Sequence, residues 1–459
     1  MCSNCVSHIA GCGWSCRHIR RSASKIGTEL RLLLITHSNH VTSFHHEIGK
    51  MILETPARIE PCGIEETIPV ALTDLVLEIR SAAEALGRGL QPDSAAELRA
   101  MTRIMNAYYS NLIEGHNTRP RDIEAALAGH MDQVENRPLA EEAAAHVRVQ
   151  EWIDDIHAQG VLFEPTSVAF IRDLHRRFYE AMPLELRFVE HNGQHKEIIP
   201  GAFRAEGEEV AVGRHLPPSA PRIPDFMDYF AARYHGLTRG ASGRILSIPA
   251  AHHRLNYIHP FLDGNGRVSR LMSHAMCQAA GIGGHGLWSI SRGLARGLQD
   301  PAEYKERMDV ADRPRQGDRD GRGNLSLATL TSFSGWFLTV MLDQLRFTDA
   351  MFDLGRLKDR YTRLIADLYP GSDRMPQLVS HVLRHGEMPR GDAPLVTGAS
   401  ERAARGDLGN LIAGGFLKSS TPKGPVRIAF PLDYRERLFP NLFTDAEPLV
   451  PPPPLPPRY

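Results

Sequence analysis

The sequence lacks most of the features that would place it in a special class of protein. It has only six cysteines in 459 residues, and four of them crowd near the N-terminus: Cys2, Cys5, Cys12 and Cys16. A disulfide framework is therefore not expected. We expect a reducing, cytoplasmic location instead. No apolar run reaches the roughly 18 residues that a membrane span needs, so we expect a soluble protein. The formal net charge of -1 points to no partner.

The first 57 residues are expected to lie outside the fold. Up to Gly49 the segment is rich in Ser, His and Arg, and its only acids are Glu29 and Glu47. A zinc site on the clustered thiolates and a transit peptide are two alternatives. The simpler interpretation of residues 1–57 is a disordered extension, or upstream sequence ahead of a translation start near Met51.

The rest of the chain is predicted to be mainly α-helical. Apolar residues recur at helical spacing over residues 73–90, 95–113, 121–129, 140–159, 167–181, 224–234, 243–258, 267–280 and 333–352. Two short extended runs around a polar turn predict a β-hairpin between residues 197 and 218. We expect an N-terminal helical region over residues 58–165 and a main domain over residues 166–350.

A further module is predicted over residues 354–432. Helical patterns at 357–368, 375–385 and 399–411 precede a strand-like run at 426–430. This order of elements resembles a winged helix-turn-helix domain. Residues 433–459 end in a proline-rich run, which predicts an extended tail.

One glycine-rich loop has the composition of a phosphate site. Binding a polyphosphate requires inward-facing N–H groups, close backbone approach and a cation. Gly264, Asn265 and Gly266, followed by Arg267, supply all three. The helix predicted from Arg267 onward would add the positive end of its dipole.

Two further side chains give this loop its chemistry. Asp263 directly precedes the glycines, and a carboxylate beside phosphate requires a cation such as Mg²⁺ between them. His259 is a group that can accept a proton near neutral pH. We call the phosphate-binding turn at residues 264–267 the nest. Together the base, the metal ligand and this nest indicate phosphoryl or nucleotidyl transfer to a nucleophile.

A metal hydrolase is an alternative from another class, built on His252, His253, His259 and Asp263. The zinc signature His-Glu-x-x-His is missing, however, and two adjacent histidines point to different faces of a helix. This alternative is weaker than group transfer.

Residues 259–270 read His-Pro-Phe-Leu-Asp-Gly-Asn-Gly-Arg-Val-Ser-Arg. They resemble the Fic (Fido) family, whose motif is His-x-Phe-x-Asp/Glu-Gly-Asn-Gly-Arg-x-x-Arg, and every fixed position is met. The resemblance covers about residues 73–350 and implies a helical Fic fold with a β-hairpin flap. It also implies a protein adenylyltransferase (AMPylator), which moves AMP from ATP to a Ser, Thr or Tyr hydroxyl of a target protein. AutoAMPylation and a homodimer are further expectations.

The resemblance also implies a role for each motif residue. His259 would be the catalytic base, Phe261 would anchor the loop in the core, and Asp263 would hold Mg²⁺. Arg270 would grip the γ-phosphate. The α- and β-phosphates would be bound by Gly264, Asn265, Gly266 and Arg267.

Two other segments resemble parts of the same family. The first is the flap, which would hold the target by main-chain pairing through Gly201, Phe203, Arg204, Val210, Val212 and Gly213. The second runs from Ser110 to Gly115 and matches the inhibitory pattern Ser/Thr-x-x-x-Glu-Gly/Asn. By resemblance, Glu114 would pair with Arg270 and occupy the guanidinium fork that the γ-phosphate needs.

Three alternatives stay open. Glu114 could instead serve the reverse reaction, removal of AMP, and Fic relatives can use other nucleotides or transfer a different group. The winged-helix-like module could make the protein a DNA-binding regulator, with Arg402 and Arg405 near phosphate or bases. The near-neutral total charge gives no support for strong duplex binding.

Overall fold

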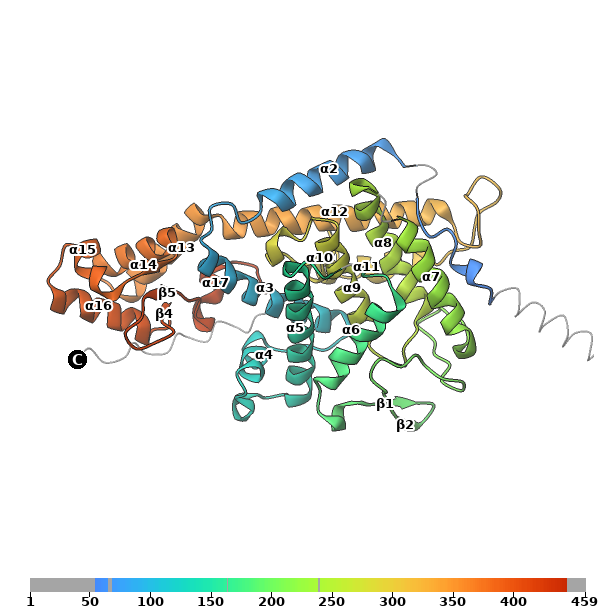
Figure 1. Ribbon diagram of the computed structural model, residues 1–459, viewed down its shortest axis with the longest axis horizontal. Coiled ribbons are helices and arrows are strands. Elements are labelled where there is room, and N and C mark those ends of the chain that lie inside the picture. The colour runs from blue at the N-terminus through green and yellow to red at the C-terminus, as the bar shows by residue number, and fades with distance from the viewer. Residues whose placement is uncertain (1–53, 65–67, 163, 238–239, 444–459) are drawn as a thin grey trace, which may run out of the picture. The chain divides into compact units, whose positions relative to one another are not determined.

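The computed structural model describes residues 54–64, 68–162, 164–237 and 240–443 (Figure 1). The described residues from Pro56 onward belong to one compact unit. They form many helices and a few short strands, so the mainly α-helical fold class is confirmed. The zinc alternative and a start near Met51 concern residues outside the described ranges.

The helices of the N-terminal region lie where the apolar periodicity predicts them. Proline occupies the first turn of several, where its missing N–H costs nothing. The Asn136 and Ser167 side chains cap the helices that follow them, residues 137–158 and 168–180, by accepting a backbone N–H. The helices are α2 (Val70–Ala85), α3 (Pro92–Ile113), α4 (Pro120–Leu127), α5 (Arg137–Ala158) and α6 (Val168–Glu180).

The predicted hairpin between residues 197 and 218 is wrong in its position. The structure pairs β1 (Phe188–His191) with β2 (Gln194–Glu197) in antiparallel register. Asn192 and Gly193 join them with φ of 51° and 75°, and Asn-Gly is a strong signal for such a two-residue turn. Residues 198–218 form a single isolated bridge, Val212 with His215.

The main domain contains four longer helices: α7 (Ile223–Leu237), α8 (Ala241–Ile258), α9 (Asn265–Ala279) and α12 (Leu327–Phe352). Helices α8 and α9 pack on each other, and α2 runs along α12 (Figure 1). Two short helices, α10 (Ile290–Arg296) and α11 (Glu303–Ala311), were not predicted. They are 7 and 9 residues long, too short for a clear periodicity. The buried core includes Phe226, Phe230, Ile248, Phe261, Leu271 and Phe337.

The C-terminal module contains the predicted helices α13 (Leu354–Leu368), α14 (Arg374–His385) and α16 (Glu401–Ala413), together with an unpredicted short helix, α15 (Ala393–Thr397). A small antiparallel sheet with strand order β3-β5-β4 accompanies them. Its strands are β3 (Glu387–Met388), β4 (Leu417–Lys418) and β5 (Val426–Ile428). The winged-helix interpretation stays a prediction.

The part of the predicted tail that the structure describes, up to residue 443, belongs to the fold. Residues 435–438 form α17 (Arg435–Leu438), and Leu438, Phe439, Leu442 and Phe443 are buried. The hydroxyl of Tyr109 in α3 donates to the Leu442 carbonyl at 3.0 Å. Apolar side chains therefore bind this stretch to the fold, and residues 444–459 lie outside the described ranges.

Short 3-10 helices connect these elements: η1 (Pro56–Ile59), η3 (Met131–Gln133), η4 (Leu184–Leu186), η5 (Ala220–Arg222), η6 (Gly284–Gly286), η7 (Arg390–Asp392) and η8 (Leu432–Tyr434). Among the described residues, no helix combines the length and the apolar character that crossing a membrane requires.

Candidate active site

The glycine-rich loop begins where α8 ends, at His259. This residue adopts a left-handed conformation with φ of 50°, and its N–H still donates to Leu255 O at 3.0 Å. The buried Arg204 side chain donates from Nε to the His259 carbonyl at 2.9 Å. The backbone that carries the predicted base is therefore fixed from two sides.

Phe261 anchors the loop in the core. Its side chain is fully buried, and its ring stacks on His175 with centroids 4.0 Å apart. The Asn265 side chain accepts from Phe261 N and donates to Phe261 O, both at 2.9 Å. Because these bonds close the loop, the phosphate contact predicted for Asn265 would come from its backbone N–H.

His175 joins the loop to the segment predicted as the flap. Its Nδ1 accepts from Gly201 N at 2.9 Å, and its Nε2 lies 3.3 Å from the Asp263 carbonyl. Burial lowers the pKa of His175 to about 4. The neutral ring can therefore accept at one nitrogen and donate at the other.

A side chain at either glycine of this loop would meet a neighbouring residue. Gly264 has φ of 80°, and a Cβ there would lie 2.9 Å from the Tyr179 ring. A Cβ on Gly266 would collide with Oε1 of Glu114. Gly264 is the N-cap of α9, so the N–H groups of the first helical turn have no acceptor within the helix. They are available to an anion.

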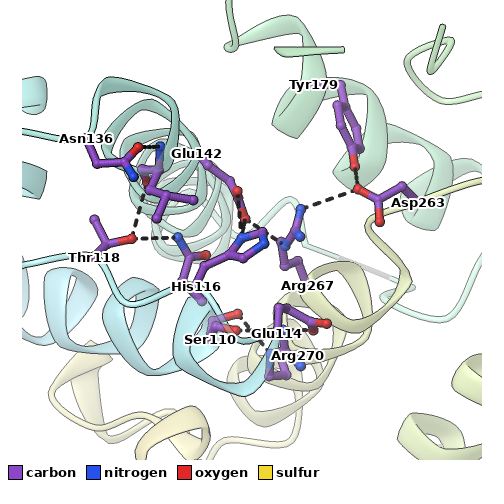
Figure 2. A network of polar contacts seen from close by, with 12 residues as sticks. Ser110, Glu114, His116, Thr118, Asn136, Glu142, Tyr179, Asp263, Arg267 and Arg270 are labelled. Atoms are coloured by element: carbon purple, nitrogen blue, oxygen red, sulfur yellow. Dashed lines mark hydrogen bonds and ion pairs between the residues drawn. The ribbon is translucent and has the colours of Figure 1, made fainter. Parts of the chain in front are cut away.

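Asp263 lies beside the nest as an ionised carboxylate. Its Oδ2 accepts from the Tyr179 hydroxyl at 2.6 Å and lies 3.7 Å from Nη1 of Arg267 (Figure 2). Burial raises the pKa of Asp263, but the Arg267 charge and the hydrogen bonds from Tyr179 and the Gly264 N–H outweigh it and hold the pKa below its ordinary value. One charged carboxylate at a phosphate nest fits Mg²⁺, which takes most of its other ligands from phosphate and water.

The ring of His259, the predicted base, is neutral over most of the pH range. Burial lowers its pKa to about 4, partly opposed by its contact with the Asn256 carbonyl. Its Nδ1 lies 3.4 Å from Asn256 O, which assigns the single proton of the neutral ring to Nδ1. Nε2 then carries the free electron pair.

Arg270 is held by the two residues of the predicted inhibitory motif, as Figure 2 shows. Its Nε donates to Ser110 Oγ at 2.8 Å, and its Nη2 donates to Ser110 O at 3.0 Å and to Glu114 Oε1 at 2.6 Å. Burial raises the pKa of Glu114, but the charges of Arg270 and Arg267 outweigh it and lower the pKa. The contact predicted between Glu114 and Arg270 is present.

A cavity of about 470 Å³ opens beside this pair. The side of α11 forms part of its wall through Tyr304, Lys305 and Met308. Six of the predicted site residues line it together: Glu114, Val212, Gly213, His259, Gly266 and Arg270. The predicted base and the occupied arginine therefore face one space.

The remaining flap residues have other surroundings. Gly201 and Arg204 are buried and brace the loop through His175 and His259. Phe203 packs against Phe261 with ring centroids 5.4 Å apart. Val210 is half-buried and does not line the cavity.

The histidines of the metal-hydrolase alternative contact other side chains. His252 contacts Ser273 Oγ and the Tyr304 hydroxyl at 2.9 and 2.8 Å, and His253 contacts Asp312 at 3.2 Å. Within the part of the chain that the structure describes, no three His, Cys, Asp or Glu side chains are grouped to hold a metal.

Four residues important to the site were not predicted. His175 and Tyr179 lie one turn apart on α6, and Glu142 and His116 contact the site from α5 and the loop after α3. The helical repeat places His175 and Tyr179 on one face, which is a weak signal. Glu142 and His116 carry no local signal, because only tertiary contacts give them a role.

The chain is similar to known proteins in the region that contains this site. Residues 165–277 match the model of the Fic/DOC family. The chain is 37% identical over 118 residues to the protein adenylyltransferase Fic of Drosophila mojavensis, covering 25% of this chain and 22% of that protein. It is 35% identical over 84 residues to the protein of the same name from Aedes aegypti, covering 18% and 16%. The chain therefore matches only about a fifth of the length of these relatives.

Two solved structures are also similar. A Fic family protein from Desulfovibrio desulfuricans G20 aligns with a TM-score of 0.43 and 17% identity, over 80% of this chain and 98% of that one. A Fic domain containing signaling protein from Bacteroides thetaiotaomicron VPI-5482 aligns with a TM-score of 0.44 and 18% identity, over 61% and 98%.

Proposed function

We propose that this protein transfers AMP from ATP to a hydroxyl side chain of a target protein, and that Glu114 restrains the reaction. One observation carries the proposal. A neutral histidine, His259, faces the same cavity as the N-terminal turn of α9 and Arg270, whose guanidinium is occupied by Glu114. The names of the similar proteins, which are adenylyltransferases, support the same chemistry.

The reaction follows from these groups. His259 Nε2 accepts the proton of the target hydroxyl, whose oxygen attacks the α-phosphorus of ATP. A P–O bond to the target forms, the bond to the β-phosphate oxygen breaks, and pyrophosphate leaves. The free N–H groups of α9 and the Arg267 guanidinium stabilise the charge on the phosphate oxygens. Asp263 would hold Mg²⁺, which neutralises charge on the departing phosphates when bound.

Restraint follows from competition for one guanidinium. Arg270 is buried, and its bonds to Ser110 and Glu114 use the donors that a γ-phosphate would need. ATP bound without that contact would be misplaced for in-line attack. Glu114 therefore lowers transfer without touching the reacting atoms.

The target would approach over the segment that ends in the Val212–His215 bridge. Val212 and Gly213 line the cavity near His259, and Val212 is 44% exposed. Residues 198–218 form only one isolated β-bridge among themselves. Main-chain N–H and C=O groups of this segment could therefore hydrogen-bond to an extended target segment.

The test is incorporation of label from [α-³²P]ATP into the protein itself and into lysate proteins. We expect weak labelling by the wild-type protein, strong labelling by Glu114→Gly, and none by Glu114→Gly with His259→Ala. Label from [γ-³²P]ATP should not be incorporated, because that phosphate leaves in pyrophosphate. Glu84→Gly, at an exposed glutamate of α2, controls for a general effect of glycine in a helix. Equal labelling by wild-type and Glu114→Gly would refute the restraint, and labelling without His259 would refute its role.

A further inference from the structure

The inhibitory helix α3 ends in a defined C-terminal motif. Gly115 has φ of 88°, its N–H donates to Leu112 O at 3.0 Å, and the N–H of His116 donates to Asn111 O at 2.9 Å. This pair of bonds is the Schellman arrangement, which fixes the last helical turn. Glu114 is the C-cap residue inside this motif, so its position depends on where His116 is held.

The His116 side chain is held by α5. Its Nδ1 lies 3.0 Å from Oε2 and 3.3 Å from Oε1 of Glu142 (Figure 2). A cation at this place also benefits from the negative end of the α3 dipole. The hydrogen bond to Glu142 is the main cause that raises the pKa of His116.

The same carboxylate contacts the phosphate-binding loop. Oε1 of Glu142 lies 3.0 Å from Nε of Arg267, closer than the 3.7 Å between Asp263 and this guanidinium. Both side chains of the ion pair are largely buried, with 11% of Glu142 and 7% of Arg267 exposed. The contact is an ion pair without the geometry of a hydrogen bond at Nε, so the attraction between the two buried charges is what holds the guanidinium beside Glu142.

We propose that Glu142 is a positioning residue with two partners: it orients Arg267 for the phosphates of ATP, and it tethers the inhibitory end of α3 through protonated His116. The proposal rests on the proposed function and adds to it a control of the restraint by pH. His116 acts only through the position of Glu114, whereas Glu142 acts through Arg267 as well.

The direction of the pH effect follows from the charges around His116. The charged groups that act on it are Glu142 of α5, Glu114 at the C-cap of α3 and Arg267 of α9. The two carboxylates favour the imidazolium, Arg267 opposes it, and the pKa of His116 is raised on balance. The tether is therefore complete at pH values below the ordinary pKa of His116 and weakens as pH rises through the raised pKa. We expect the restraint by Glu114 to weaken in the same direction.

The ratio of wild-type to Glu114→Gly labelling isolates the restraint, because both proteins share the chemical step. We expect this ratio to rise with pH above about 6.5, by at most about tenfold per pH unit for one proton. His116→Gln should show a higher ratio than wild type at low pH and little change with pH. His116→Lys should keep a low ratio across the range, because lysine retains the charge. His130→Gln, at an exposed histidine after α4, serves as the matched control.

The positioning of Arg267 by Glu142 is tested separately, through the KM for ATP. In the Glu114→Gly background, Glu142→Gln should raise the KM for ATP several-fold with a smaller change in kcat, and His116→Gln should change neither. An unchanged KM for Glu142→Gln would overturn the positioning of Arg267. A wild-type ratio and pH slope in His116→Gln would overturn the tether. If Glu114→Gly itself transfers no label at any pH, the proposed function fails instead, so the two failures are distinguishable.

Discussion

The carboxylate of Glu114 lies 2.6 Å from Nη2 of Arg270, across 156 positions of sequence. It also lies against the backbone of Gly266, where a Cβ would collide with it. Glu114 therefore occupies two adjacent parts of the predicted phosphate site: the guanidinium of Arg270 and the backbone surface at Gly266. An ATP molecule that reaches Arg270 must displace this carboxylate.

Ser110→Ala should loosen the restraint only in part. The change removes the Oγ acceptor of Arg270 Nε but keeps the Ser110 carbonyl and Glu114. A hydrogen bond to a charged group contributes about 1.5–3 kcal/mol, so AMP labelling should lie between that of wild type and Glu114→Gly. Thr102→Ala, which removes a hydroxyl bonded to Leu98 O in the same helix, is the control. Labelling at the wild-type level would mean that Ser110 has no part in holding Arg270.

The pH profile of the unrestrained enzyme should report His259. Because its pKa is lowered to about 4, the imidazole is neutral and able to accept a proton throughout the range from neutral pH to about 5. Activity of Glu114→Gly should therefore fall only as pH drops toward 4. NMR titration of the His259 ring in that variant gives an independent measurement. A midpoint near 6.5 in either experiment would contradict a base that is neutral because of its lowered pKa.

Tyr179→Phe should change the requirement for Mg²⁺. The variant loses the hydroxyl that donates to Asp263 Oδ2 at 2.6 Å and orients this carboxylate. Loss of such an outer partner typically weakens metal binding by about 10–100-fold. Titration of Mg²⁺ against labelling by Glu114→Gly should show a higher half-saturating concentration, and chelation should abolish labelling in both proteins. An identical titration curve would show that Asp263 does not depend on Tyr179.

Phe261→Ala should cost stability as well as activity. The ring is fully buried and stacks on His175, so its removal leaves a cavity under the loop. Such a truncation costs about 3–5 kcal/mol, which should lower the midpoint of urea unfolding. Phe261→Leu should recover most of the stability and less of the activity, because the loop above loses its stacked support. Unfolding of Phe261→Ala at the wild-type midpoint would contradict the anchoring role.

Local patterns predicted much of the fold. Helices α3, α5 and α9 begin and end within a few residues of the predicted bounds, because each carries an apolar stripe long enough to show the helical period. The hairpin was misplaced, since the Gly201 N–H donates to His175 and the Arg204 N–H donates to the Pro260 carbonyl. Within residues 198–218 only Val212 and His215 pair as in a strand ladder. The Asn192-Gly193 pair was a local signal for the true hairpin, and the sequence interpretation did not use it.

The sequence by itself determined the glycine-rich loop, the helix behind it and the residue types for base, anion and metal, because these depend on spacing within a dozen positions. Only the tertiary structure decided how the side chains are used. In the structure the Asn265 side chain hydrogen-bonds to the backbone of Phe261, and the Tyr179 hydroxyl donates to Asp263. The Glu142 carboxylate contacts both His116 and Arg267. These contacts join residues that are far apart in the sequence. They form only when the buried faces of separate helices pack together, so no local sequence pattern predicts them.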